Sequence, residues 1–216
     1  MTYIGIDFSL NSPGVCIQDA KGTYHFLSFF NYGKRIWDEE GIRIPKAFWV
    51  HKELSDDSAL SCFAYNREVQ SKEFLLRERE KLNDAHNIAE LIGNVLVTVA
   101  GTTNVKIGLE GFSYGSKGNS FIDMIQYNTF LRSELMKCYG IENISVFQPS
   151  HVKKIAGKGN ANKHYMIKAF QDDVLDDKNL RKTKLWKYVK GKDYSVKIPK
   201  PLDDLVDSYF ILNANK

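Results

Sequence analysis

Five short segments combine apolar and β-branched residues in runs of the length expected for β-strands. They are residues 2–8, 14–19, 23–30, 105–110 and 144–148. Residues 18–22 supply a turn between the second and third segments and predict a hairpin. The first three strands are therefore expected to form an antiparallel meander, with Ile4, Ile6 and Phe8 on one face of the sheet and Asp7 on the other.

Elsewhere apolar residues recur at intervals of three and four, which is typical of amphipathic helices. The helices predicted in this way cover residues 73–100, 120–138, 163–171 and 202–213. Residues 31–72 show no clean period, and we interpret them as an insertion, whereas residues 180–200 are basic and irregular. The order βββαβαβα predicts one α/β domain over residues 1–216 with a mixed sheet.

The composition is that of a globular protein, since 43% of the 216 residues are hydrophobic. No run approaches the ~20 apolar residues that cross a bilayer, and no basic region followed by an apolar stretch opens the chain, so neither a membrane span nor a secretory signal is expected. The three cysteines are widely spaced and form no C-x-x-C pair, which argues against a zinc site or a disulfide framework. A reducing compartment, the cytoplasm, is the expected location.

The net charge of +4 is distributed unevenly along the chain. Residues 1–147 carry 15 Lys and Arg against 18 Asp and Glu, whereas residues 148–216 carry 15 against 8. A single lysine most often belongs to a solvated face. An excess over a whole segment favours binding of a polyanion.

Four acidic residues far apart in the sequence stand at informative places on the predicted elements. Asp7 lies in the first strand, Glu110 ends the fourth, and Asp204 and Asp207 share one face of the last helix because they are spaced i, i+3. Each acid alone has an ordinary structural explanation, such as a strand end or a helix dipole. Together they predict a site for divalent cations, Mg²⁺ or Mn²⁺, which compensate convergent carboxylates. Asp203 is expected to point away from its neighbour Asp204.

A second signal is the run of residues 148–163, in which two glycines alternate with lysines. Freed backbone amides and ammonium groups suit a phosphate backbone, although such a run is by itself also typical of an ordinary exposed loop. The candidate DNA-binding lysines are Lys153, Lys154, Lys158 and Lys163.

Taken together, these residues resemble the RuvC-type Holliday junction resolvases of the ribonuclease H-like superfamily, including phage and viral members. The resemblance covers most of residues 1–30 and 74–216; the insertion, the long turn after Asp7 and the basic segment depart from it. It implies a mixed five-stranded sheet, three antiparallel strands and then two parallel, flanked by helices. It also implies that two metal ions are held by Asp7, Glu110, Asp204 and Asp207, and that Lys163 is a catalytic phosphate contact.

The activity implied is that of a crossover junction endodeoxyribonuclease in DNA recombination and repair. It would cut four-way DNA junctions by paired symmetric nicks that leave 5′-phosphate and 3′-hydroxyl ends, in the host cytoplasm if the protein is viral. Two symmetric cuts imply a homodimer, for which the aromatics Phe121, Tyr127 and Phe130 are interface candidates, although core positions explain at least two of them better. Phe112 and Tyr114 are candidates for stacking on unpaired bases.

Two alternatives stay open at this stage, and a third is disfavoured. A ribonuclease H-like nuclease that cuts RNA–DNA hybrids or flap DNA would use the same acids. A non-catalytic DNA-binding protein would share the fold, but it has no use for four convergent carboxylates. An ATPase of the actin and sugar-kinase type also opens with an Asp-bearing strand and a hairpin, but it needs a second phosphate-binding hairpin and a Gly-Gly adenosine motif, and the sequence shows neither.

Overall fold

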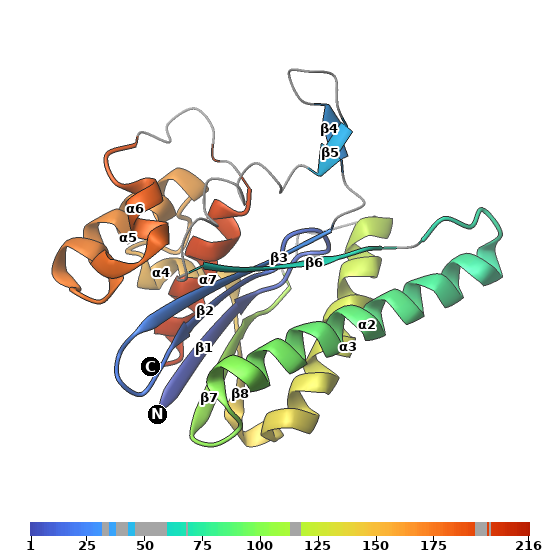
Figure 1. Cartoon of the computed structure of the whole chain (residues 1–216), viewed down its shortest axis with the longest axis horizontal. Coiled ribbons are helices and arrows are strands. Elements are labelled where there is room, and N and C mark those ends of the chain that lie inside the picture. The colour runs from blue at the N-terminus through green and yellow to red at the C-terminus, as the bar shows by residue number, and fades with distance from the viewer. Residues whose placement is uncertain are drawn as a thin grey trace.

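A six-stranded sheet runs through the centre of the protein in the computed structural model (Figure 1). The structure describes residues 1–31, 35–37, 43–45, 60–67, 69–112, 118–192, 198 and 200–216. The strands lie in the order β6-β3-β2-β1-β7-β8. Their bounds are β1 Thr2–Asp7, β2 Gly14–Gln18, β3 Tyr24–Asn31, β6 Leu60–Tyr65, β7 Val105–Glu110 and β8 Ile144–Phe147.

The strand directions confirm the ribonuclease H-like arrangement expected from the sequence. β1, β2 and β3 are mutually antiparallel neighbours, and β7 and β8 continue the sheet parallel to β1. The prediction of five strands is wrong, because β6 pairs in parallel with the outer side of β3. β6 lies inside the 31–72 insertion, and its sequence, Leu-Ser-Cys-Phe-Ala-Tyr, lacks the regular apolar–polar alternation that reveals a strand.

The rest of the insertion is described only in part. A separate antiparallel pair is formed by β4, Arg35–Trp37, and β5, Arg43–Pro45. Residues 32–34, 38–42 and 46–59 of the insertion lie outside the described residues.

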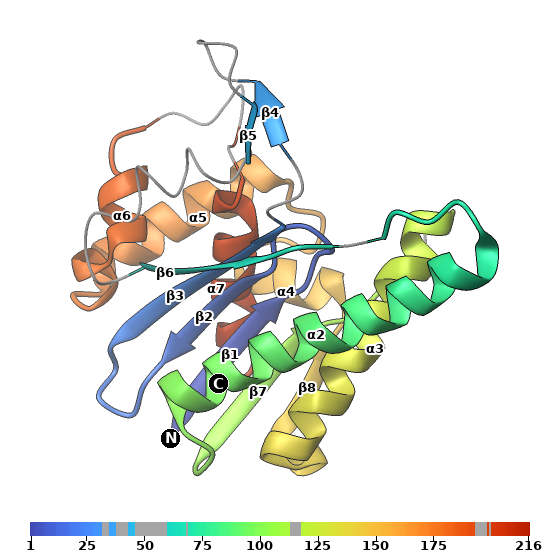
Figure 2. The ribbon, with the colours of Figure 1, turned by 45° about the vertical axis from the view of Figure 1, so that its right-hand side comes forward.

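Helices cover both faces of the sheet (Figures 1 and 2). α2 and α3 cover one face, while α7 lies directly on the other with α4, α5 and α6 beyond it. Their bounds are α2 Phe74–Ala100, α3 Asn119–Tyr139, α4 Pro149–Ile155, α5 Lys163–Asp176, α6 Lys184–Val189 and α7 Leu202–Ala214. Short 3-10 turns occur at η1, Ile141–Asn143, and η2, Leu180–Lys182. None of the helices in the described ranges is long and apolar enough to span a membrane.

The basic segment 180–200 is not irregular as predicted, because η2 and α6 occupy its first half. α6 has six residues, too few for an apolar period to show in the sequence. Thr183 begins it by accepting a hydrogen bond of 3.2 Å from the backbone N–H of Trp186. Such a cap satisfies an otherwise free donor of the first turn.

The two faces of β1 divide as predicted. Ile4 and Ile6 are fully buried in the core formed with α2 and α3. Asp7 alternates with Ile6 and therefore points to the other face, which α7 covers.

α7 lies so close to the sheet that β1 and β2 need glycines beneath it. A Cβ on Gly5 would collide with the backbone of Ser208 and Leu212, and one on Gly14 would lie 2.5 Å from the backbone oxygen of Asp204. The side chains of α7 that face the edge of the sheet are thereby held at a defined height above β1.

Candidate active site

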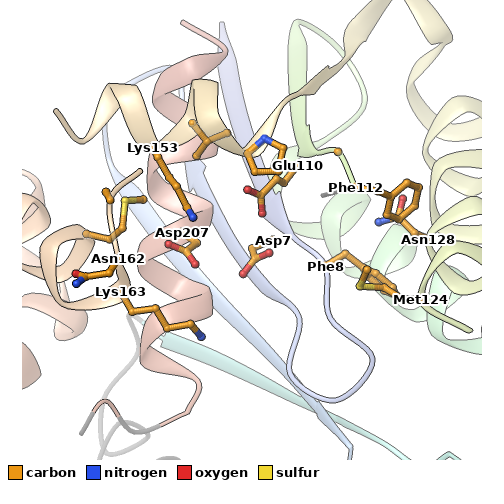
Figure 3. Close-up of a pocket in the computed structure, with 15 residues that line it drawn as sticks. Asp7, Phe8, Glu110, Phe112, Met124, Asn128, Lys153, Asn162, Lys163 and Asp207 are labelled. Carbon is orange, nitrogen blue, oxygen red and sulfur yellow. The ribbon is translucent and has the colours of Figure 1, made fainter. Parts of the chain in front are cut away.

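Asp7 and Glu110 come to the same edge of the sheet because β1 and β7 are parallel neighbours. The register pairs Ile6 with Leu109, the residues immediately before the two acids. α7 brings Asp207 to the same place. These three acids line a cavity of about 480 Å³, and Figure 3 shows their carboxylates turned into it.

Burial and mutual repulsion raise the pKa values of these acids. Burial raises the pKa of Asp7 well above its usual value, and three neighbouring carboxylates raise it further. These are Asp204, Asp207 and Glu110, in order of decreasing effect. The pKa of Asp207 rises to about 7, because of burial first and then the charges of Glu110 and Asp204. The four predicted acids are therefore close enough for their negative charges to repel one another.

Asp203 and Asp204, in the first turn of α7, are both 4% exposed. Ser12 donates a hydrogen bond of 2.6 Å from Oγ to Asp204 Oδ2, and Lys200 donates to Asp204 Oδ1. Lys200 Nζ also lies 3.0 Å from Asp203 Oδ2, so the two acids share this ammonium group and Asp203 does not point away as predicted. Asp204 thus has a protein donor on each oxygen and does not line the cavity, although its charge raises the pKa of Asp7.

Two of the four predicted DNA-binding lysines line the cavity. Burial raises the pKa of Glu110, and the positive charge of Lys153, on α4, lowers it again in part. Lys163, the first residue of α5, forms an ion pair with Asp203 and lowers the otherwise raised pKa of Asp207. Both ammonium groups therefore lie beside the acids, as Figure 3 shows.

The other two lysines lie outside the cavity lining. Lys154 is exposed on α4, and Lys158 places its Nζ 4.4 Å from the centroid of the Tyr165 ring. The loop that carries Lys158 is built around this ring: Asn162 caps α5 by accepting a 2.9 Å hydrogen bond from the Tyr165 N–H. Gly157 has φ +121°, a conformation that favours glycine, and a Cβ there would lie 2.5 Å from the Tyr165 hydroxyl, which would have to shift. The loop therefore has a defined conformation, and Lys163 follows it as the first residue of α5.

The side of the cavity next to α3 carries larger, less charged side chains. It is lined by Phe8, Phe112, Met124 and Asn128. The Phe112 ring meets Phe121 edge to face, with centroids 5.9 Å apart, which places the predicted stacking residue at the cavity beside Glu110. Tyr114, the other predicted stacking residue, lies outside the described residues.

The aromatic residues of α3 predicted as interface candidates differ in burial. Tyr127 is 1% exposed and its hydroxyl lies 3.2 Å from both Asp84 Oδ2 and Arg67 Nη2, so it is a core residue and not an interface residue. Phe130 packs partly against the same core, and Phe121 is partly buried. The homodimer stays a prediction.

The donor set around the cavity has the chemistry that hard divalent cations prefer, because carboxylate oxygens are the usual ligands of Mg²⁺ and Mn²⁺. Within the described part of the chain, no three His, Cys, Asp or Glu side chains are close enough to hold one ion jointly in this conformation. The buried Oδ1 of Asp203 has no hydrogen-bond partner among the same residues, and the other acids repel one another. A divalent cation would relieve this repulsion, so the residues fit such an ion chemically if the carboxylates draw together around it.

Sequence reasoning missed Ser12 and Lys200 as partners of Asp204. Lys200 stands four residues before Asp204, the spacing of many local ion pairs, and this is a signal that could have found it. Ser12 lies 192 residues from Asp204 in the sequence, and no local pattern predicts that contact.

No protein-family model and no curated protein matches this chain. Among solved structures, that of RuvC from Thermus thermophilus aligns with 99% of this chain and 94% of its own, with a TM-score of 0.48 and 13% sequence identity. The crystal structure of the yeast mitochondrial Holliday junction resolvase Ydc2 aligns with 98% of this chain and 75% of its own, with a TM-score of 0.47 and 12% identity. The order and directions of the strands define the fold as the ribonuclease H-like arrangement.

Proposed function

We propose that this protein is a metal-dependent endodeoxyribonuclease that cleaves branched DNA, with four-way Holliday junctions as its substrate. The observation that carries the proposal is the meeting of Asp7, Glu110 and Asp207 with Lys153 and Lys163 around one cavity. The acids offer ligands for divalent cations, and the lysines offer positive charge for a phosphodiester. A metal-dependent phosphodiesterase can use both kinds of group at one place, the cations for hydrolysis and the lysines to hold the phosphate.

Asp7, Glu110 and Asp207 would hold two ions of Mg²⁺ or Mn²⁺, with Asp204 as the fourth predicted ligand. Bound there, the ions supply a water of lowered pKa and neutralise the charge that develops on the phosphate. Asp7 would be the central ligand of this set, because the charges of the other three acids all act on it. Asp204 already accepts a hydrogen bond on each oxygen, so a cation bound to it would compete with Ser12 and Lys200.

The remaining residues of the site would bind and orient the DNA. Lys153 and Lys163 would contact the phosphate in the cavity, while the exposed Lys154 and Lys158 would reach neighbouring phosphates. Phe112, at the cavity, would stack on a base that is unpaired near the branch point.

The products proposed are 5′-phosphate and 3′-hydroxyl ends at paired symmetric nicks. Two nicks related by symmetry need two active sites, so the active form would be a homodimer with one cavity in each copy. Sedimentation with and without junction DNA tests this part of the proposal, and a monomer under both conditions would exclude it.

The central test is cleavage of four matched substrates: a four-way DNA junction, a flap, a linear duplex and an RNA–DNA hybrid, each with Mg²⁺, Mn²⁺ or EDTA. We expect paired nicks in the junction that EDTA abolishes. Cleavage of the hybrid or flap instead would transfer the activity to the related nuclease class. Binding without any cleavage would identify a non-catalytic DNA-binding protein.

A further inference from the structure

One surface segment outside the cavity combines many positive charges with no negative charge. Residues 178–192 contain seven Lys and Arg and no Asp or Glu. All but the partly buried Lys184 are exposed. We call this segment the η2–α6 basic surface; its exposed cations are Lys178, Arg181, Lys182, Lys187, Lys190 and Lys192.

The η2–α6 basic surface is held firmly against the rest of the protein. Leu180, Leu185 and Val189 are 0% exposed and belong to the core on the α7 side of the sheet. Gln171 of α5 donates from Nε2 a hydrogen bond of 2.9 Å to the backbone oxygen of Val189. Because the apolar side chains point inward, the cations between them are displayed outward at defined positions. The segment is therefore a built surface and not a loose charged tail.

The exposed cations are not neutralised by nearby acids. None of the six forms an ion pair with an acid in the described part of the chain, and the Lys192 ammonium lies 3.7 Å from the centroid of the Tyr188 ring. The nearest acid in sequence, Asp177, accepts the backbone N–H groups of Asn179 and Leu180 through Oδ1, at 2.7 and 3.2 Å. Like charges crowded in this way repel one another, and a polyanion would offset the repulsion.

The position of this surface relative to the cavity follows from α5. α5 begins with Lys163 at the cavity and has 14 residues, which span ~20 Å at 1.5 Å per residue. η2 follows its far end, and α6 returns beside it as far as Gln171, about half-way along (Figures 1 and 2). The cations therefore stand roughly 12–20 Å from the cavity end of α5, about four to six base pairs of duplex DNA at ~3.4 Å each.

We propose that the η2–α6 basic surface binds the sugar–phosphate backbone of a double-stranded DNA arm whose branch point is at the cavity. This inference rests on the proposed function for the position of the branch, but the contact itself is electrostatic and independent of cleavage.

The test measures DNA binding in protein carrying Asp7→Asn, which removes cleavage from the comparison. The variant Lys187→Gln/Lys190→Gln/Lys192→Gln is compared with Lys72→Gln/Arg79→Gln/Lys137→Gln, which removes the same charge from the α2–α3 side. With a junction of ~12-bp arms, the Lys187/Lys190/Lys192 variant should bind DNA at least about 10-fold more weakly than its parent at low salt. The slope of the logarithm of its association constant against the logarithm of the salt concentration should become shallower by about 2–3. The second should stay within about two-fold.

Arm length gives an independent readout. Shortening the arms from ~12 to ~4 base pairs should weaken binding of the unaltered surface more than binding of the first variant, because ~4 base pairs reach only the near edge of the basic surface. If the triple variant melts earlier than its parent, Arg181→Gln/Lys182→Gln replaces it, with an expected slope change of about 2. Unchanged affinity, salt slope and arm-length dependence in these variants would overturn the inference.

The outcomes separate this inference from the proposed function. If DNA binding depends on the basic surface but the unaltered protein never cleaves DNA, the DNA-binding role of the surface stands and the proposed nuclease function is wrong. If EDTA abolishes cleavage but the surface substitutions leave DNA affinity unchanged, the proposed nuclease function stands and the DNA-binding role of the basic surface is wrong.

Discussion

Ser12 Oγ donates a hydrogen bond of 2.6 Å to Asp204 Oδ2, and so joins the turn after β1 to the first turn of α7. Lys200 occupies the other oxygen of the same carboxylate. The acids at the edge of the sheet therefore divide into two kinds. Asp7, Glu110 and Asp207 face the cavity, while Asp204 is held from behind by two donors of the protein. This difference leads to distinct expectations for substitutions at each position.

Replacing Asp7 with Asn should abolish cleavage and preserve DNA binding. The amide keeps the shape of the side chain but removes the charge that a divalent cation needs, so we expect junction cleavage to fall by at least about 100-fold. Single-turnover cleavage and equilibrium binding measure the two effects separately. Asp172→Asn, at an exposed position of α5, is the matched control and should cleave normally. Normal cleavage by Asp7→Asn would show that the catalytic centre is elsewhere.

Replacing Lys200 with Met should destabilise the protein in EDTA. The substitution leaves Asp203 and Asp204 buried without their shared cation. We expect a loss of about 1–3 kcal/mol in the free energy of unfolding, less than for a fully buried pair because the Lys200 side chain is 38% exposed. Urea denaturation measures it. Lys190→Met, at an exposed position, controls for loss of a surface charge; equal effects at both positions would argue against the internal role of Lys200.

The metal-free protein should be more stable at pH 5 than at pH 8. The pKa of Asp207 is raised to about 7 in the folded state, mainly by burial, against an ordinary value of 3.8. A raised carboxyl pKa means that the folded state binds the proton more tightly than the unfolded state. Stability therefore falls as pH rises between these two values, and the penalty is complete above the higher one.

Thermal melts in EDTA at the two pH values measure this effect. Asp207→Asn should show a smaller difference between them, since it removes one of the titrating groups. If the melting temperature of Asp207→Asn differs between the two pH values as much as that of the unaltered protein, groups other than Asp207 cause the pH dependence.

Replacing Gly5 with Ala should displace α7 and impair both stability and cleavage. The added methyl group would collide with backbone atoms of Ser208 and Leu212, which cannot move aside as a flexible side chain can. We expect a loss of about 2 kcal/mol or more in the free energy of unfolding, the upper part of the range for overpacked cores. Gly93→Ala in α2 is the contrast, because its new Cβ would meet side-chain atoms and no backbone, the nearest being Glu134 Cγ at 3.0 Å.

Denaturation of both glycine variants, followed by cleavage assays on the folded fractions, tests this expectation. Gly93→Ala should be close to neutral, since alanine favours the helix. If Gly5→Ala folds and cleaves as the unaltered protein does, the close contact between β1 and α7 does not position the acids.

The residue pattern determined most of the elements and the set of acids. Strand alternation and helical spacing depend on residues near one another in the sequence, so β1, β2, β3, β7 and the longer helices could be predicted from it. The positions of Asp7 and Glu110 followed from the same patterns, because each is defined by the strand that carries it. Two elements could not be predicted in this way. α6 is too short to show a helical period, and the residues of β6 do not alternate regularly.

Only the tertiary structure decided which acids face the cavity and which are held by the protein. Asp204 and Asp207 share a helix face in the sequence pattern, yet Asp204 bonds to Ser12 and Lys200 while Asp207 lines the cavity. That division depends on how closely α7 packs on Gly5 and Gly14, a contact between residues about 200 positions apart. Such contacts are set by the packing of whole elements, and the local sequence of either partner does not contain them.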